Sequence, residues 1–184
     1  MSLDPLTLTL PPHAVVLLIG APGAGKTTFC HRYFKPETIV SLDRLRWAVS
    51  GDEGDQSATR DAVRIQGILL RSRISRGLTT VVDATNLEFT VRRRIRKLAL
   101  QRKRPVIVYL FQESEDVCQA RNAGRPRRVE PGILAMLHRK TPTAGQLAVE
   151  GFGDIRPIPP GALELTEPGP GAGPGDSLSD GNRA

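Results

Sequence analysis

Apolar and polar positions follow one another along the chain in blocks that predict strands and helices in turn. The run Val15–Ile19 is wholly apolar, which is typical of a central parallel strand buried on both faces. Shorter apolar segments predict further strands at 38–41, 79–82, 106–111 and 154–158. Amphipathic or polar segments predict helices at 25–34, 43–51, 59–76, 88–102, 115–122, 132–140 and 143–150. This alternation predicts an α/β fold, a three-layer sandwich with a central parallel sheet.

Two of the predicted helices have apolar residues at roughly helical spacing, which we expect to face the core. In the first helix they are Val63, Ile65, Ile68, Leu69 and Ile74. In the second they are Phe89, Val91, Ile95, Leu98 and Ala99. Trp47 is interpreted as a core residue too, in preference to a platform for base stacking.

The chain divides into a folded part at 1–159 and a Gly/Pro-rich part at 160–184, which is predicted to be a disordered tail with no folded role. The net charge is +7, and the tail holds four acidic residues and one basic residue. The folded part therefore has 25 basic and 15 acidic residues, a balance that suits a polyanionic partner but is also found on ordinary solvated surfaces. Cys30 and Cys118 form no metal-binding or redox pattern and are expected to be reduced, as in a cytoplasmic protein.

A glycine-rich loop directly after the first strand carries the clearest chemistry. It fits the pattern G-x-x-x-x-G-K-[ST], the P-loop, in which backbone N–H groups and a helix N-terminus hold phosphate oxygens. Lys26 is expected to contact the β- and γ-phosphates of ATP, and Thr27 to bind Mg²⁺. The predicted nucleotide-binding residues are Gly20, Ala21, Pro22, Gly23, Ala24, Gly25, Lys26, Thr27 and Thr28.

A carboxylate and an arginine follow the second predicted strand. Asp43 stands where that strand ends, and the carboxyl ends of parallel strands face the ligand crevice. Arg46 is three residues further on and shares a helix face with Asp43. Asp43 could accept the proton of an attacking hydroxyl, and Arg46 could hold a substrate phosphate. From the pattern alone, a helix cap at Asp43 with a surface ion pair explains the two residues equally well.

Three further polar features allow more than one interpretation. Asp83 ends the third strand, where it could hold Mg²⁺ or bond the turn 84–86. Arg121, Arg125, Arg127 and Arg128 form a basic cluster that suits a lid closing over a triphosphate, or a solvated loop. The stretch 92–104 has eight basic residues and no acidic one, which fits a solvated helix face or a nucleic-acid contact.

In their order, these motifs resemble the kinase domain of bacterial polynucleotide kinase-phosphatase. The resemblance covers about residues 14 to 155 and rests on five stretches: Gly20–Thr28, Ser41-x-Asp43-x-x-Arg46, Ser50–Gln56, Val81–Asn86 and Val117–Arg125. It implies a P-loop NTPase fold with a helical lid, and transfer of the γ-phosphate of ATP to a 5′-hydroxyl end of RNA or DNA. It also implies that Asp43 is the general base, that Arg46 grips the terminal phosphodiester, and that Arg121 and Arg125 belong to the lid. No D-x-D-x-T phosphatase motif or ligase-like segment is found, so only the 5′ phosphorylation is expected.

Two other functions remain open on the sequence. One is a small-molecule kinase on the same fold, and the other is an ATP-binding regulatory module without a phosphoryl acceptor. Basic charge and the pattern around Asp43 favour the polynucleotide, and Asp43 with the lid arginines counts against the regulatory module. The apolar runs are too short to span a membrane, so no membrane partner is expected.

Overall fold

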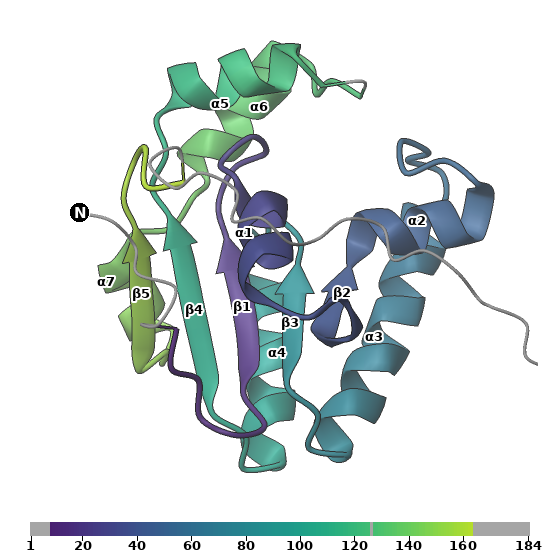
Figure 1. Ribbon diagram of the computed structural model, residues 1–184, viewed down its shortest axis with the longest axis vertical. Coiled ribbons are helices and arrows are strands. Elements are labelled where there is room, and N and C mark those ends of the chain that lie inside the picture. The colour runs from purple at the N-terminus through teal and green to yellow at the C-terminus, as the bar shows by residue number, and fades with distance from the viewer. Residues whose placement is uncertain (1–7, 126, 164–184) are drawn as a thin grey trace, which may run out of the picture.

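A single parallel sheet organises the fold. The computed structural model describes residues 8–125 and 127–163. Its strands are β1 (Val15–Ile19), β2 (Ile39–Ser41), β3 (Thr80–Asp83), β4 (Val106–Phe111) and β5 (Asp154–Ile158). The strands pair in the order β2-β3-β1-β4-β5, and every pair is parallel (Figure 1). The predicted α/β class is therefore confirmed.

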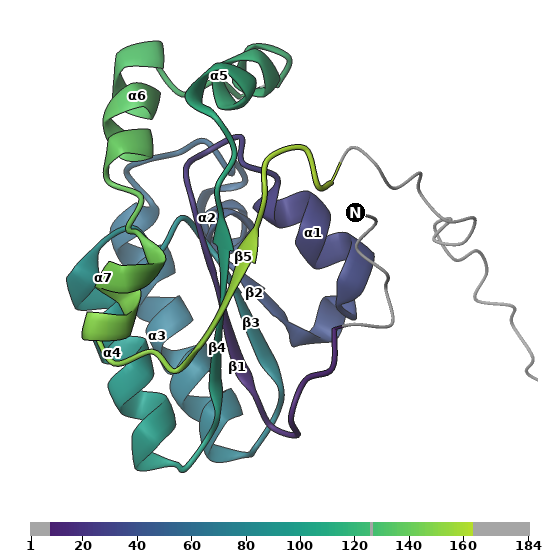
Figure 2. The same ribbon diagram turned by 90° about the vertical axis from the view of Figure 1, so that its left-hand side faces the viewer.

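Helices cover both faces of the sheet, as Figure 2 shows. Helix α1 (Lys26–Tyr33) lies on one face, and α3 (Thr59–Ser75), α4 (Phe89–Gln101) and α7 (Ala144–Val149) lie on the other. Helices α5 (Glu115–Ala123) and α6 (Pro131–Arg139) stand beyond the carboxyl ends of the strands, and α2 (Leu42–Ser50) follows β2 directly. A 3₁₀ turn at Pro36–Thr38 precedes β2. No helix in the described ranges is long and apolar enough to cross a membrane.

The alternation of side chains along β1 builds two cores. Val16 and Leu18 pack with Phe29 and Cys30 of α1, whereas their neighbours in the strand point to the opposite face. On that second face Val15, Leu17 and Ile19 pack with apolar residues of α3 and α4. All five residues of β1 are fully buried, as a central strand covered on both faces requires. The central strand therefore fixes the loop that follows it firmly in place.

The predicted inward faces of α3 and α4 are partly wrong. In α3, Ile74 is buried, but four of the other predicted core residues are exposed: Val63, Ile65, Ile68 and Leu69. The helix instead packs through Ala62, Gln66, Gly67 and Leu70. In α4, Ile95 and Ala99 are buried and Leu98 is partly buried, as predicted, whereas Phe89 and Val91 are exposed. Small and polar residues let the helices approach closely, a signal that a count of large apolar residues misses.

The folded part extends past Pro159. Ala162 is 5% exposed, and the Gly161 N–H donates a hydrogen bond to Glu113 at 3.1 Å. Arg32 of α1 donates a hydrogen bond to the Leu163 carbonyl at 3.3 Å. Residues of the predicted tail at 160–163 therefore contact the fold, and the rest of that tail, 164–184, lies outside the described residues.

Candidate functional site: a phosphate loop and a flanked carboxylate

The loop 20–25 joins β1 to α1 in a backbone shape that only glycine adopts easily. Gly23 has φ +86° and Gly25 has φ +92°, both in the left-handed region. A Cβ at Gly23 would lie 2.5 Å from the carbonyl oxygen of Cys118 in α5. The glycine therefore serves two purposes, the turn itself and the close approach of α5.

This double constraint gives a prediction with a matched control. Gly23→Ala should destabilise the fold by about 2–5 kcal/mol, because it adds a steric clash to the cost of a left-handed alanine. Gly51→Ala should cost only about 1–2 kcal/mol, since Gly51 has φ +77° but nothing within 4 Å of an added Cβ. Urea unfolding of the two variants measures the difference. Equal losses would show that α5 does not press on the loop.

Lys26 opens α1 and turns back over the loop. Its Nζ donates hydrogen bonds to the carbonyl oxygens of Gly20 at 2.9 Å and Ala21 at 2.7 Å. The residue is 8% exposed, and this burial lowers the pKa of Lys26 to about 8. The charge of Arg125 lowers that pKa further, which places Arg125 in the electrostatic surroundings of Lys26. The loop thus holds a buried cation against its own carbonyl oxygens, at the N-terminus of a helix where phosphate oxygens are favoured.

Thr27 and Asp83 meet at the carboxyl ends of neighbouring strands. The Thr27 hydroxyl donates to Asp83 Oδ2 at 3.2 Å. Asp83 is 6% exposed, and burial raises the pKa of its carboxyl even though Lys26 and Thr27 act in the opposite direction. Hydroxyl and carboxylate oxygens are the ligands that Mg²⁺ prefers, and the ion usually keeps several waters and phosphate oxygens besides. Two protein oxygens at this position therefore fit a Mg²⁺ ion bound together with a nucleotide.

The turn after β3 is held by Asn86, a residue that the sequence analysis did not single out. Its Nδ2 donates to the carbonyl oxygens of Leu18 at 2.8 Å and Val82 at 3.2 Å, and its φ is +50°. Asn86 ties β1 to β3 directly below the phosphate loop. Asp83 instead accepts the hydroxyl of Thr27, on the side that faces the phosphate loop, and its metal role stays a prediction. An asparagine after a strand end is the signal that could have been used, because it tolerates the left-handed region.

Helix α5 contacts the phosphate loop through Arg121. Its Nη1 donates to the Gly23 carbonyl at 3.2 Å, and its Nη2 pairs with Glu113 at 3.1 Å. Glu113 also accepts the Gly161 N–H, and its backbone carbonyl bonds His138 of α6 at 2.9 Å. Glu113 was not predicted as a site residue, yet it connects α5 and α6 to Gly161. Arg121 therefore lies against the phosphate loop, and the lid role of Arg121 and Arg125 stays a prediction.

Asp43 and Arg46 form an ion pair on α2, close to the strand that ends at Asp83. Ser41, the last residue of β2, lies beside Asp83 in the sheet. Asp43 is two residues beyond this end of β2. Asp43 is not the helix cap, because Ser41 occupies that position and Asp43 lies in the first turn. The Asp43 side chain is 54% exposed, whereas that of Arg46 is 7% exposed. The carboxylate is thus open to a ligand while its partner is buried beneath it.

Arg127, in the connection between α5 and α6, approaches the Asp43 carboxylate. Its Nη1 lies 3.9 Å from Asp43 Oδ1 and donates to the Glu53 carbonyl at 2.9 Å. Arg46 Nε donates to that same carbonyl at 2.8 Å. Burial lowers the pKa of Arg46, and the charge of Arg127 lowers it further. Asp43 is therefore flanked by two cations, of which Arg127 is 40% exposed and open to a ligand.

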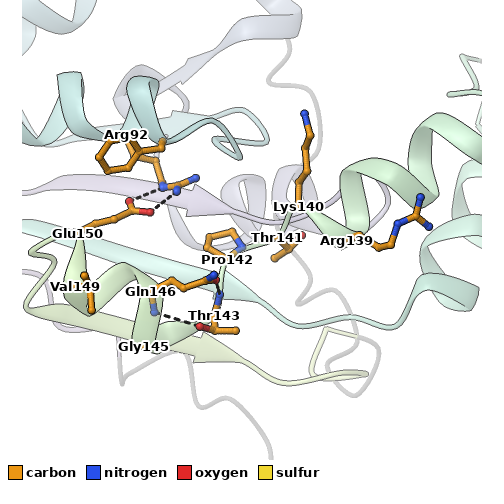
Figure 3. A pocket seen from close by; sticks show the side chains of 11 residues that line it. Arg92, Arg139, Lys140, Thr141, Pro142, Thr143, Gly145, Gln146, Val149 and Glu150 are labelled. Carbon is orange, nitrogen blue, oxygen red and sulfur yellow. Dashed lines mark hydrogen bonds and ion pairs between the residues drawn. The ribbon is translucent and has the colours of Figure 1, made fainter.

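Arginines of the basic stretch 92–104 make structural contacts within the fold. Arg92 is 4% exposed, pairs with Glu150 and donates to the carbonyl of Asn86 at 3.0 Å. Arg96 donates to the Gly151 carbonyl at 2.8 Å. Figure 3 shows Arg92 and Glu150 in a cavity of about 690 Å³ between α4, α6 and α7. No residue of the phosphate loop lines this cavity, so we place the candidate site at the loop instead.

Trp47 is the clearest disagreement with the sequence analysis. The predicted core residue is 59% exposed on α2. Its neighbour Arg46 takes the buried position in its place, with its guanidinium bonded to Glu53 and paired with Asp43. A buried arginine is accommodated here because each bond is made to a specific oxygen, which hydrophobicity patterns cannot reveal.

Solved structures with a similar fold include a chain of an RNA repair complex and proteins named as kinases. A chain in the Pnkp1/Rnl/Hen1 RNA repair complex superposes with a TM-score of 0.61 at 14% identity, covering 73% of this chain and 46% of that chain. A protein from Chloroflexus aurantiacus that is named as a kinase gives 0.57 at 15% identity, covering 79% and 87%. A sugar kinase from Janibacter gives 0.55 at 18% identity, covering 85% and 88%. At these identities the likeness shows a shared P-loop kinase-like fold, and this chain spans less than half of the first relative's length.

The family comparison agrees with the geometry of the loop. No curated protein matches the chain in sequence. The family model described as an AAA domain matches residues 15–138, which include β1, the phosphate loop, α2, the strand end at Asp83, α5 and most of α6. The chain therefore belongs to this AAA domain family of P-loop proteins.

Proposed function

We propose that the protein is a kinase that transfers the γ-phosphate of ATP to a 5′-hydroxyl end of RNA or DNA. The observation that carries the proposal is the exposed carboxylate of Asp43 between two arginines, next to the strand end that holds Asp83. A carboxylate in this position suits a general base, and the arginines suit a phosphodiester of the acceptor. A neutral sugar has no phosphodiester to pair with these two cations.

In the proposed reaction, the strand's 5′-oxygen attacks the γ-phosphorus and forms a new P–O bond. Asp43 accepts the hydroxyl proton, and the bond between the γ-phosphorus and the β–γ bridging oxygen breaks, so that ADP leaves. The loop N–H groups and Lys26 hold the phosphates, while Arg121 and Arg125 lie where charge spreads during transfer. Mg²⁺, held through Thr27 and Asp83, would neutralise charge on the phosphates when bound.

The arginine pair leads to a test of acceptor binding by salt dependence. Binding of a 5′-hydroxyl oligonucleotide should weaken with salt, with a slope of log K against log salt near −1.4 for about two phosphate contacts. Arg127→Ala should reduce the magnitude of the slope by about 0.7. Arg64→Ala is the matched control, because Arg64 is an exposed helix arginine paired with Asp61 at 3.0 Å.

Fluorescence anisotropy of a labelled hexanucleotide at several salt concentrations gives all three slopes. Binding without any salt dependence would remove the proposed phosphate contacts. An equal change in the Arg64→Ala variant would show that general surface charge, and not the site, holds the strand. The alternative function, a kinase on the same fold that phosphorylates a small alcohol, predicts no oligonucleotide binding even at low salt.

A further inference from the structure

The indole of Trp47 is an exposed aromatic surface beside the acceptor site. Trp47 is the only tryptophan in the chain and is 59% exposed. Aromatic rings of this size normally contribute most when they are covered, and their faces are suited to stacking against other flat rings. The position of Trp47 relative to Asp43 suggests what covers it.

Trp47 lies on the same face of α2 as Asp43. The two residues are four apart, so their side chains are neighbours on the helix surface. Long side chains in helices point back toward the N-terminus, which places the indole over the turn that carries Asp43. Val49, the other exposed large apolar residue of α2, is two residues from Trp47 and therefore points in another direction. The exposed carboxylate and the exposed ring thus form one surface.

The charges around that surface match a strand end. Arg127 and Arg46 are within ion-pairing distance of Asp43, and the Arg127 side chain is 40% exposed. A 5′-hydroxyl end presents a hydroxyl, a phosphodiester and a flat base within one nucleotide. Proteins that hold single strands combine cations for the backbone with aromatic platforms for the bases. On the protein, Asp43 matches the hydroxyl, Arg127 the phosphodiester and Trp47 the base.

We propose that Trp47 is the platform on which the terminal nucleobase of the acceptor stacks while its 5′-hydroxyl reaches Asp43. The inference rests on the proposed function, since it takes the acceptor to be a polynucleotide. Stacking uses the π-face that every base has, so this contact holds the end without reading its sequence. Trp47 would then favour strand ends over sugars, which present no aromatic ring.

The kinetic test pairs a change in the protein with a change in the acceptor. Trp47→Ala should raise KM for a 5′-hydroxyl RNA hexamer by about 5- to 150-fold, the range given by loss of base–aromatic stacking. Trp47→Phe should retain most of the affinity, and Val49→Ala is the control on the same helix. A hexamer whose terminal nucleotide lacks its base should have a raised KM on the wild type, with no further rise on Trp47→Ala. An equal rise on both hexamers would assign Trp47 a structural role and overturn the proposal.

Because the chain has one tryptophan, its fluorescence reports the same contact without catalysis. The normal hexamer should quench this fluorescence, and the hexamer without the terminal base should not. If wild type phosphorylates the hexamer but neither fluorescence nor KM depends on the terminal base, the stacking proposal alone fails. If wild type phosphorylates only small alcohols, the proposed function fails and the stacking proposal with it. A change in oligomeric state of Trp47→Ala by sedimentation, with unchanged KM, would assign Trp47 to an interface between copies and overturn the proposal.

Discussion

Asp43→Asn is expected to lower the rate of phosphoryl transfer by about 10²–10⁴ while leaving nucleotide affinity unchanged. Asparagine keeps the size of the side chain but accepts a proton far less readily. Asp43 lies in the first turn of α2, outside the phosphate loop, so the nucleotide contacts of Lys26 and Thr27 should persist. Single-turnover rates and ATP affinity, measured separately, test both parts of the expectation.

The matched control is Asp61→Asn on α3. Asp61 forms an ion pair with Arg64 at the same i,i+3 spacing as Asp43 and Arg46. The side chains of Asp61 and Arg64 are both exposed. This control removes an exposed helix ion pair without touching the site, and should leave transfer unchanged. Collapse of ATP affinity in Asp43→Asn with surviving chemistry would place Asp43 among the nucleotide or structural contacts.

Lys26→Met should reduce transfer by at least about 10²–10³ and preserve the fold, because the lysine faces the phosphates and methionine fills a similar volume. The buried Nζ is bonded to two loop carbonyls, Gly20 and Ala21. We expect it to exchange these bonds for phosphate oxygens when nucleotide binds. Lys140→Met is the control, since Lys140 is a half-exposed surface lysine paired with Glu88 at 3.4 Å. Normal turnover in a folded Lys26→Met variant would contradict the phosphate-loop account.

The pKa of Lys26 gives this variant a stability signature. Its folded pKa of about 8 lies below the ordinary value of 10.5, because burial disfavours the charged form. Between these pH values the unfolded chain binds more protons than the folded one, so this lysine makes stability rise as pH increases through that window. The free energy of unfolding of Lys26→Met should lack this rise. The same pH dependence in both proteins would mean that other groups cause it.

The sequence predicted the parts of the fold that depend on continuous patterns. The apolar run Val15–Ile19 became the central strand, and the glycine pattern after it became the loop with left-handed Gly23 and Gly25. These predictions succeeded because one backbone shape and one burial pattern explain each motif. Thr27 and Asp83 lie at the same edge of the sheet, as expected because the carboxyl ends of parallel strands meet there.

Contacts between distant segments could not be predicted in the same way. Trp47 and Arg46 exchange the expected buried and exposed positions, because Arg46 finds Asp43 and the Glu53 carbonyl as partners. Glu113 accepts a hydrogen bond from the Gly161 N–H, which is 48 residues away in the sequence. Arg127 approaches Asp43 from a different element. Each depends on which oxygen lies nearby in three dimensions, and a periodic pattern in one dimension does not contain that information.

The central claim is that the acceptor of the phosphate is a polynucleotide 5′-hydroxyl. The direct measurement offers γ-labelled ATP with Mg²⁺ to equal amounts of 5′-hydroxyl RNA, 5′-hydroxyl DNA and a set of sugars, sugar acids and nucleosides. The account predicts label on the 5′ ends of RNA, DNA or both, removable by a phosphatase, and transfer slowed by about 10²–10⁴ in Asp43→Asn. Label found only on a small alcohol, or released only as free phosphate, would contradict it.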